Sequence, residues 1–254
     1  MKPEQSLSVA IIALNEEDRL PACLESVRFA DEVVVVDSGS TDRTVAIAEA
    51  SGCRVYVEDW KGFGRQKQSA VDKCRHNWVL IIDADERVPP ETAAAICTSI
   101  QDAAIDGCSF PRKNFFNGKW IRSCGWWPDR VVRLFRRDRG NMKDVLVHET
   151  VHVRGVVVDL DTPLYHYPIR SLSDVLVKIN RYSSLGAEKL YQAGGRSSVF
   201  KAAIKGIAAF MKTYFLQRGV FGGAEGFILS FSHGVYTCYK YLKLCEKKVQ
   251  SHES

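Results

Sequence analysis

The sequence lacks the two glycine-rich patterns that most often bind the phosphates of a nucleotide. No Gly-x-Gly-x-x-Gly follows the first predicted strand, at residues 7–14, and no Gly-Lys-Ser or Gly-Lys-Thr occurs anywhere. The first absence weakens a dinucleotide-binding interpretation, and the second excludes a Walker-type phosphate loop. Neither arrangement is therefore predicted for this chain.

The eight cysteines lack the paired spacing of a zinc site or a disulfide framework. They are scattered, and no Cys-x-x-Cys is present. Cys53 and Cys108 lie in strand-like runs and are interpreted as small core residues. The N-terminus has no basic region followed by an apolar stretch, so no secretory signal is expected. We therefore expect a reducing, cytoplasmic compartment.

A strong charge of one sign is also absent. The 254 residues include 35 basic and 30 acidic side chains, which gives a net charge of +5. This excess is too small to indicate a nucleic-acid partner, and we expect none. The basic side chains gather instead within residues 130–139 and 240–248. Each cluster fits a face that is simply solvated, and each also fits a surface that binds a phosphorylated substrate or an anionic membrane.

The first hundred residues alternate apolar, strand-like runs with segments of helical spacing. Strands are predicted at 7–14, 32–36, 54–57 and 78–82, and helices at 17–29, 41–50 and 65–75. This alternation predicts an α/β fold with a mostly parallel sheet and right-handed crossovers. Further strands are predicted at 108–112, 131–135 and 153–160, followed by a helix at 172–192.

Carboxylates follow the fourth predicted strand directly, at Asp83, Asp85 and Glu86. Like charges this close repel one another unless a positive group lies between them, and hard divalent cations take oxygen ligands. A metal ion that carries a phosphorylated substrate is one explanation. The other is an acid-rich helix start, opened by Pro89 and Pro90.

The ends of the other predicted strands support a site at this edge. Asn15 and Glu16 follow the first strand, and Asp37 ends the second. In open parallel sheets, ligands bind beyond the carboxyl ends of the strands. The turn after Asp37 also has a purely structural explanation, because Ser40 or Thr41 is a natural helix cap.

The C-terminal part is unusually apolar. Residues 199–216 carry only Lys201, Lys205 and Lys212 as charges before Arg218, and at helical spacing these lie within about 40° of one another. Residues 226–239 form a second uncharged run, shorter than the ~20 residues that span a bilayer. The alternatives are a buried helical hairpin and a helix that lies in a membrane interface.

Three segments then identify a family. Residues 8–17 (SVAIIALNEE), 32–42 (EVVVVDSGSTD) and 78–86 (WVLIIDADE) resemble the inverting family 2 glycosyltransferases with the Rossmann-like GT-A fold. Residues 125–136, 147–149 and 164–167 are similar to the bacterial branch that adds sugars to the lipopolysaccharide inner core, of the β-1,4-glucosyltransferase type. The resemblance covers nearly the whole chain.

The resemblance implies a domain division and a donor site. It places a GT-A catalytic domain at 1–168 and a helical, membrane-associating extension at 169–254. The donor is a nucleotide-sugar, often a UDP-sugar, bound with Mg²⁺ or Mn²⁺. The implied metal ligand is Asp85, with His166 as a further ligand, although a lone histidine is more often structural. The residues implied to bind the nucleotide-sugar are Ala13, Asn15, Glu16, Asp37, Lys67, Asp83 and Ala84.

The resemblance implies specific roles for some of the residues in the donor site. Asp37 matches the carboxylate that contacts the uracil ring, and Asp83 matches one that supports the metal or the ribose. Lys67 falls where the family often places a basic residue near the diphosphate. Its neighbours Gln66 and Gln68 depart from the family's usual Arg-Asn.

Inversion also requires a base on the acceptor side of the sugar. The resemblance points to Glu149, with Asp129 as the second candidate and His148 as a residue that orients the loop. Without the resemblance, Glu149 would be interpreted as a helix-start acid.

The expected reaction moves a sugar, with glucose favoured, from a UDP-linked donor to a lipopolysaccharide-core or other lipid-linked acceptor. The expected location is peripheral, on the cytoplasmic face of the inner membrane. Two alternatives stay open: transfer onto polyprenyl phosphate, which is already ionised and needs no base, and nucleotide-sugar binding without turnover.

Overall fold

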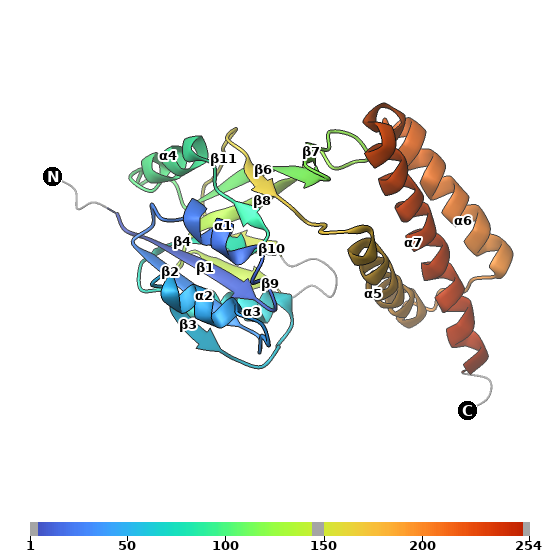
Figure 1. Ribbon diagram of the computed structural model, residues 1–254, viewed down its shortest axis with the longest axis horizontal. Coiled ribbons are helices and arrows are strands. Elements are labelled where there is room, and N and C mark those ends of the chain that lie inside the picture. Colours follow the sequence, from blue (N-terminus) through green and yellow to red (C-terminus); the bar gives the residue numbers. More distant parts are fainter. Residues whose placement is uncertain (1–4, 144–149, 251–254) are drawn as a thin grey trace. The chain divides into compact units, whose positions relative to one another are not determined.

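The computed structural model describes residues 5–143 and 150–250. The described residues form two compact units, and each is considered by itself. The first comprises those within Met1–Lys113 and Asp129–His166, and the second those within Asn114–Pro128 and Tyr167–Ser254. Figure 1 shows the course of the chain.

Strands and helices alternate through the start of the first unit, as the sequence predicts. These elements are β1 (Leu7–Ala13), α1 (Leu20–Ser26), β2 (Glu32–Asp37), α2 (Thr44–Ala50), β3 (Arg54–Val57), α3 (Phe63–Asp72), β4 (Trp78–Asp83), β5 (Glu86–Arg87) and α4 (Pro90–Ser99). The later strands are β6 (Gly107–Phe116), β8 (Arg130–Arg136), β9 (Gly140–Lys143), β10 (Thr150–Val153), β11 (Val157–Asp159) and β12 (Leu164–His166). β6 continues into the second unit from Asn114.

The main sheet has the strand order β3-β2-β1-β4-β8-β6-β12-β5. β1 pairs in parallel with β2 and β4, and β2 pairs in parallel with β3. β8 then joins β4 and β6 in antiparallel pairing. The parallel strands end at the same edge of the sheet, which places the residues after β1, β2 and β4 together.

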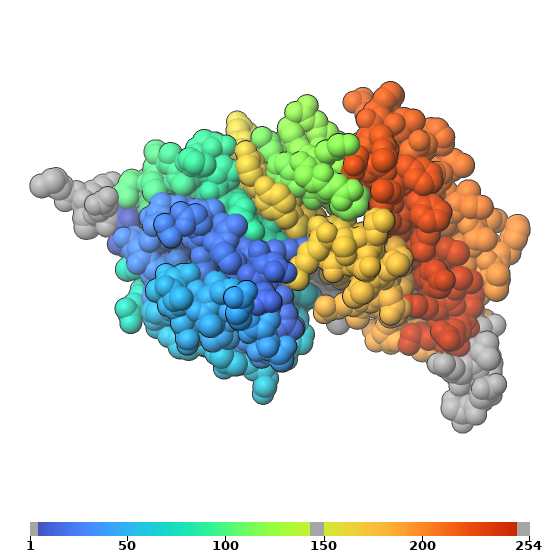
Figure 2. All heavy atoms as spheres, viewed as in Figure 1, coloured from blue at the N-terminus to red at the C-terminus, as the bar shows by residue number. Residues whose placement is uncertain are grey.

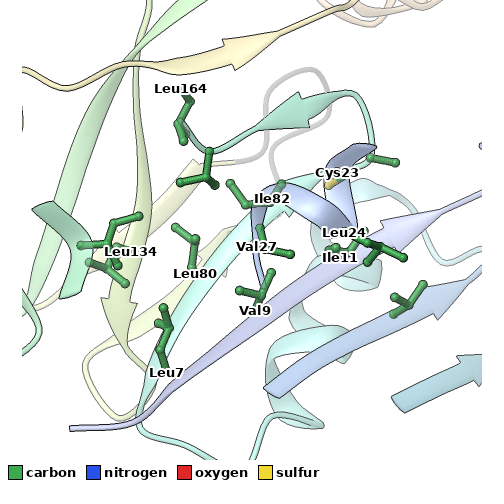
Figure 3. Packing of buried hydrophobic residues seen from close by; sticks show 14 of the residues in the cluster. Leu7, Val9, Ile11, Cys23, Leu24, Val27, Leu80, Ile82, Leu134 and Leu164 are labelled. Atoms are coloured by element: carbon green, nitrogen blue, oxygen red, sulfur yellow. The ribbon is translucent and has the colours of Figure 1, made fainter. Parts of the chain in front are cut away.

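Two apolar layers cover the sheet, because successive side chains of a strand point to opposite faces. One layer joins Val9 and Ile11 of β1 to Leu24 of α1 (Figure 3). Leu20 of α1 belongs to the same layer. The other joins alternate residues of β1, β2 and β4 to α3, with Val71 among its members. The parallel strands are therefore buried on both sides, which explains their continuous apolar runs.

The predicted fold class is confirmed, and two local predictions need correction. The helix expected at 17–29 is only α1, Leu20–Ser26. The strand expected at 153–160 is divided between β10 and β11, which pair with different partners. Glu86 lies in the short strand β5, and the helix expected to open at Pro89 and Pro90 does start at Pro90.

The second unit is mainly helical. Its elements are β7 (Lys119–Trp120), α5 (Leu172–Gln192), α6 (Val199–Met211), the π-helix η1 (Lys212–Leu216), the 3-10 helix η2 (Gly219–Gly222) and α7 (Gly223–Gln250). β7 pairs with the end of β6. α6 lies alongside α7 (Figures 1 and 2). Within residues 5–143 and 150–250, no helix combines the length and apolarity needed to cross a membrane.

Candidate active site

The acidic residues after β4 lie among cationic side chains of the same unit. Asp83 Oδ1 accepts from Lys67 Nζ at 2.7 Å, and Asp83 Oδ2 accepts from Arg133 Nη2 at 2.6 Å. Lys67 comes from α3 and Arg133 from β8, and both side chains are buried. The carboxylate of Asp83 is thus held from two sides.

A β-bulge explains how Arg133 reaches this position. Cys108 of β6 pairs with Leu134 of β8, and the next residue, Ser109, pairs with Val132. Arg133 is therefore the extra residue of β8, with no residue opposite it. Bulges of this kind redirect a side chain out of the regular alternation and are frequent next to active sites.

Arg133 also connects Asp83 to Glu86. Its Nη2 lies 2.7 Å from Glu86 Oε1, and the Glu86 side chain is fully buried. Glu86 Oε2 in turn accepts from the Asp83 backbone N–H at 3.1 Å. Glu86 therefore positions Arg133 and the end of β4, instead of facing a ligand.

The network extends to Asp129 through Arg112. Arg112 Nη1 lies 3.2 Å from Glu86 Oε1, and Arg112 Nη2 lies 2.8 Å from Asp129 Oδ2. Arg112 Nε donates to the same Asp129 oxygen at 3.0 Å. The second base candidate thus has one carboxylate oxygen bound twice by a guanidinium.

These charges decide the ionisation of Asp83. Burial by itself raises the pKa of Asp83, but the positive charges of Arg133 and Lys67 outweigh burial and hold the pKa far below its ordinary value. Asp83 is therefore an anion whose charge is already balanced by the protein.

Asp85 has different neighbours. Its Oδ2 lies 3.5 Å from His166 Nε2 and 3.5 Å from Arg19 Nη1. Burial raises the pKa of Asp85, but the hydrogen bond and charge of His166 outweigh it and lower the pKa. The pairing of His166 with Glu86 in the β12–β5 ladder places this histidine beside the acidic residues.

These residues fit a divalent cation whose remaining ligands come from elsewhere. Asp85 and His166 offer an oxygen and a nitrogen at one place, whereas Asp83 is engaged by Lys67 and Arg133. Among the described residues, no group of three or more His, Cys, Asp or Glu side chains could hold a metal ion. Mg²⁺ commonly binds through one or two carboxylates plus substrate phosphates, which matches this limited set.

The loops after β1 and β2 are tied together. Asn15 adopts a left-handed backbone conformation with φ of 54°, which asparagine tolerates better than most residues. Its Oδ1 accepts from the Thr41 N–H at 2.9 Å, and its N–H donates to Ser40 Oγ at 2.8 Å. Asn15 therefore fixes the separation of the two loops at the edge where a nucleoside is expected.

Asp37 is fully buried, and its carboxylate accepts hydrogen bonds from the turn that follows it. Oδ1 accepts from the N–H groups of Gly39 and Ser40 at 2.9 and 2.7 Å, and Oδ2 accepts from the Ser40 hydroxyl. The sequence places Asp37 correctly at the strand end. The structure adds that Asp37 shapes the turn.

The other predicted donor-site residues lie at the same edge. The carbonyl of Ala13 accepts from the Ser38 N–H at 2.9 Å, and the Glu16 N–H donates to Thr44 Oγ1 at 2.8 Å. Ala84 is buried, and its carbonyl accepts from Arg87 at 2.9 Å. Backbone groups of these three residues make the contacts described at the ends of β1 and β4.

Sequence reasoning missed Arg19, Arg112 and Arg133 as members of the site. The only available signal was the basic cluster at residues 130–139, which does not single out Arg133. The predicted base Glu149 and its neighbour His148 lie outside the described residues.

The comparisons with known proteins agree with one another. The profile described as "Glycosyl transferase family 2" matches residues 8–156. The lipopolysaccharide core biosynthesis glycosyltransferase LpsC of Rhizobium meliloti is 32% identical, over 97% of this chain and 94% of that protein. An uncharacterised glycosyltransferase of Rickettsia conorii is 30% identical, over 97% of this chain and 92% of its own.

A solved structure supports the fold. The S. aureus TarS 1–349 fragment in complex with UDP-GlcNAc matches with a TM-score of 0.50 and 16% identity. The match covers 97% of this chain and 92% of the fragment. At this identity the similarity concerns the fold.

Proposed function

The chain belongs to glycosyl transferase family 2, and from that premise we propose that it moves a sugar from a UDP-linked donor to a lipopolysaccharide-core acceptor. One observation carries the proposal: Asp85 lies beside His166 at the end of β4, while the protein's own cations neutralise Asp83. The similarity to LpsC, named for lipopolysaccharide core biosynthesis, supports this acceptor class. Glucose is the proposed sugar.

In the proposed donor site, residues at the ends of β1, β2 and β4 surround the nucleotide. The loop of Asn15 and Glu16, with Ala13, forms one wall, and the turn shaped by Asp37 forms the other. Lys67 is the basic residue nearest the diphosphate. Its contact with Asp83 keeps it at the strand ends, where a phosphate oxygen would meet its ammonium group.

Asp85 and His166 are the proposed ligands of Mg²⁺ or Mn²⁺, with Asp83 and Ala84 completing the loop beside them. When bound, the ion supplies Lewis-acid stabilisation to the charge that develops on the departing diphosphate. The residues of the chain orient the donor and hold their own charges fixed. Arg133 and Glu86 keep Asp83 in place without themselves facing the ligand.

Glu149 is the proposed base, and Asp129 is the second candidate. A carboxylate in this role takes the proton of the attacking hydroxyl, while the bond from the anomeric carbon to the leaving diphosphate breaks on the opposite side. Because Asp129 Oδ2 accepts two hydrogen bonds from Arg112, only a change in that pairing would make this oxygen available for a proton.

We further propose that residues 1–168 form the catalytic domain and that residues 169–254 attach it peripherally to the cytoplasmic face of the inner membrane. A lipid-linked acceptor would make such attachment useful, because it places the enzyme at the surface where the acceptor lies. Deletion beyond Gly195 should then release the protein into the soluble fraction, and a truncated protein still on membranes would refute the attachment.

The function is tested by incubating the purified protein with Mn²⁺, a panel of UDP-sugars and lipopolysaccharide truncated in its inner core. Mass spectrometry should show the addition of one sugar residue from one donor. In a parallel assay with polyprenyl phosphate as the acceptor, transfer onto that lipid instead of lipopolysaccharide would favour a polyprenyl-phosphate sugar transferase. Nucleotide binding with neither transfer nor donor hydrolysis would favour a binding protein without turnover.

A further inference from the structure

Helix α6 presents an apolar face to solvent. Phe200 is 76% exposed and Ile207 is 60% exposed, and Ile204 and Met211 are also exposed. At about 100° per residue, these four side chains fall within about 60° of one another around the helix. Exposed apolar patches of this kind on a folded protein mark interaction sites.

The opposite side of α6 is fixed by close packing on α7. Ala202 and Gly206 are buried, and a Cβ added to Gly206 would lie 2.8 Å from Cys238 Cβ and 3.1 Å from the Gly234 carbonyl. Only a residue without a side chain permits this approach. Because this side of α6 packs on α7, the exposed apolar side chains lie on the side of α6 that is turned away from α7.

The π-helix η1 prolongs this face. A π-turn holds about one more residue than an α-turn, which rotates the following residues back toward the side of Met211. Phe215 and Leu216 are exposed there, Leu216 by 80%. The next turn, η2, carries Phe221, which is 85% exposed. The end of the hairpin thus presents large apolar side chains to solvent.

Positive charges border this apolar surface. Lys201, Lys205 and Lys212 are exposed and lie within about 40° of one another, directly beside the apolar face. Between residues 199 and 240, Glu225 is the only acidic residue in the sequence, and it is paired with Lys119 at 2.8 Å. Two copies that met through this surface would bring like charges together, which opposes self-association.

We propose that an anionic phospholipid bilayer covers this surface, with α6 lying in the plane of the membrane interface and Phe221 at the inserted end of the hairpin. The inference rests on the proposed function, which needs the enzyme at a membrane, and it names the surface that makes the contact. The apolar side chains enter the boundary between headgroups and acyl chains, and the lysines pair with anionic headgroups.

The test is co-sedimentation of the full chain with vesicles of phosphatidylcholine, with and without phosphatidylglycerol. Wild-type protein should bind the anionic vesicles. Ile207→Asp and Phe221→Asp should each weaken that binding about tenfold, because each removes a large apolar contact and adds a negative charge. Replacing Lys201, Lys205 and Lys212 with serine should weaken binding to anionic vesicles by about fivefold for each lysine.

Val156→Asp is the matched control, because Val156 is 55% exposed in the first unit and should leave vesicle binding unchanged. The proposal is overturned if wild-type protein does not bind anionic vesicles, or if Val156→Asp weakens vesicle binding as much as Ile207→Asp does. It is also overturned if Ile207→Asp converts a dimer to a monomer in analytical ultracentrifugation without changing vesicle binding.

UDP binding with Mn²⁺, measured on the same samples, separates this inference from the proposed function. Unchanged UDP binding in all variants, together with the expected losses of vesicle binding, supports the surface. If wild-type protein binds UDP and transfers sugar but does not bind vesicles, the surface fails and the transferase assignment stands. If it binds vesicles through this surface but does not bind UDP, the assignment fails instead.

Discussion

Arg133 Nη2 donates a 2.6 Å hydrogen bond to Asp83 Oδ2, and the bulge in β8 makes this contact possible. The same nitrogen lies 2.7 Å from Glu86 Oε1. Burial lowers the pKa of Arg133, but the charges of Asp83 and Glu86 outweigh burial and raise it above its ordinary value. A fixed guanidinium therefore stands where the acidic residues would otherwise repel one another.

Replacement of Arg133 by methionine should destabilise the protein. The change leaves Arg112 as the cation paired with the buried Glu86 and removes Arg133 from beside Asp83, so we expect a loss of about 3 kcal/mol in the free energy of unfolding. Urea denaturation measures this loss. Arg130→Met, on the same strand but with a more exposed side chain, should cost no more than about 1 kcal/mol. Equal losses for the two variants would contradict the account.

Arg133→Lys separates charge from geometry. Both carboxylates contact the single nitrogen Nη2, which the rigid guanidinium holds between them. Lysine keeps the positive charge but carries it on a flexible stem, so this variant should fold yet bind UDP with Mn²⁺ more weakly than the wild type. Isothermal titration calorimetry measures the difference. Wild-type affinity in Arg133→Lys would show that the position of Asp83 does not depend on the guanidinium.

Glu32, at the start of β2, should make stability depend on pH. Burial raises its pKa, but hydrogen bonds from the Arg75 N–H, Ser8 and Arg54 outweigh burial and lower the pKa below its ordinary value of 4.5. A carboxyl group with a lowered folded-state pKa stabilises the protein above its ordinary pKa, and this contribution is lost as the pH falls toward the folded-state value.

Glu32→Gln should therefore lower the free energy of unfolding at pH 7, and the difference from wild type should shrink as the pH falls below about 4.5. Urea denaturation between pH 3 and pH 7 measures this trend. Glu25→Gln is the control, because the Glu25 side chain is 62% exposed and pairs with the exposed side chain of Arg28. A difference that stays constant with pH would rule out this role for Glu32.

The base assignment predicts unequal effects of two carboxylate substitutions. Glu149→Gln should reduce the rate of transfer to a lipopolysaccharide acceptor by about 10²- to 10⁴-fold while leaving UDP affinity unchanged. Asp129→Asn should have a smaller effect on the rate, because Asp129 is bound by Arg112. A larger rate loss in Asp129→Asn, with UDP affinity intact, would exchange the two roles.

Long apolar runs made the parallel strands predictable. Residues such as Val9, Ile11 and Ile82 are buried because both faces of the sheet are covered. Strands buried on both faces have continuous apolar sequences, which can be recognised without a structure. The same reasoning placed Asn15, Asp37 and Asp85 at the strand ends. Binding roles for these residues remain predictions.

The arginines of the site could not be predicted in the same way. Arg133 breaks the two-residue alternation of its strand, because a bulge rather than the regular pleat directs its side chain. His166 is named with Asp85 on the family resemblance alone, because the two strands whose pairing brings it there have two and three residues and are too short to leave a pattern. Both contacts depend on the three-dimensional arrangement of segments that are far apart in the chain.

The most direct test of the account is calorimetric titration of UDP into wild-type protein and Asp85→Ala, each with and without Mn²⁺. The account predicts that Mn²⁺ strengthens UDP binding to the wild type by about tenfold or more and has no such effect on Asp85→Ala. His166→Ala should reduce the effect of Mn²⁺ in part. An equal effect of Mn²⁺ on wild type and Asp85→Ala would contradict the assignment of the metal site.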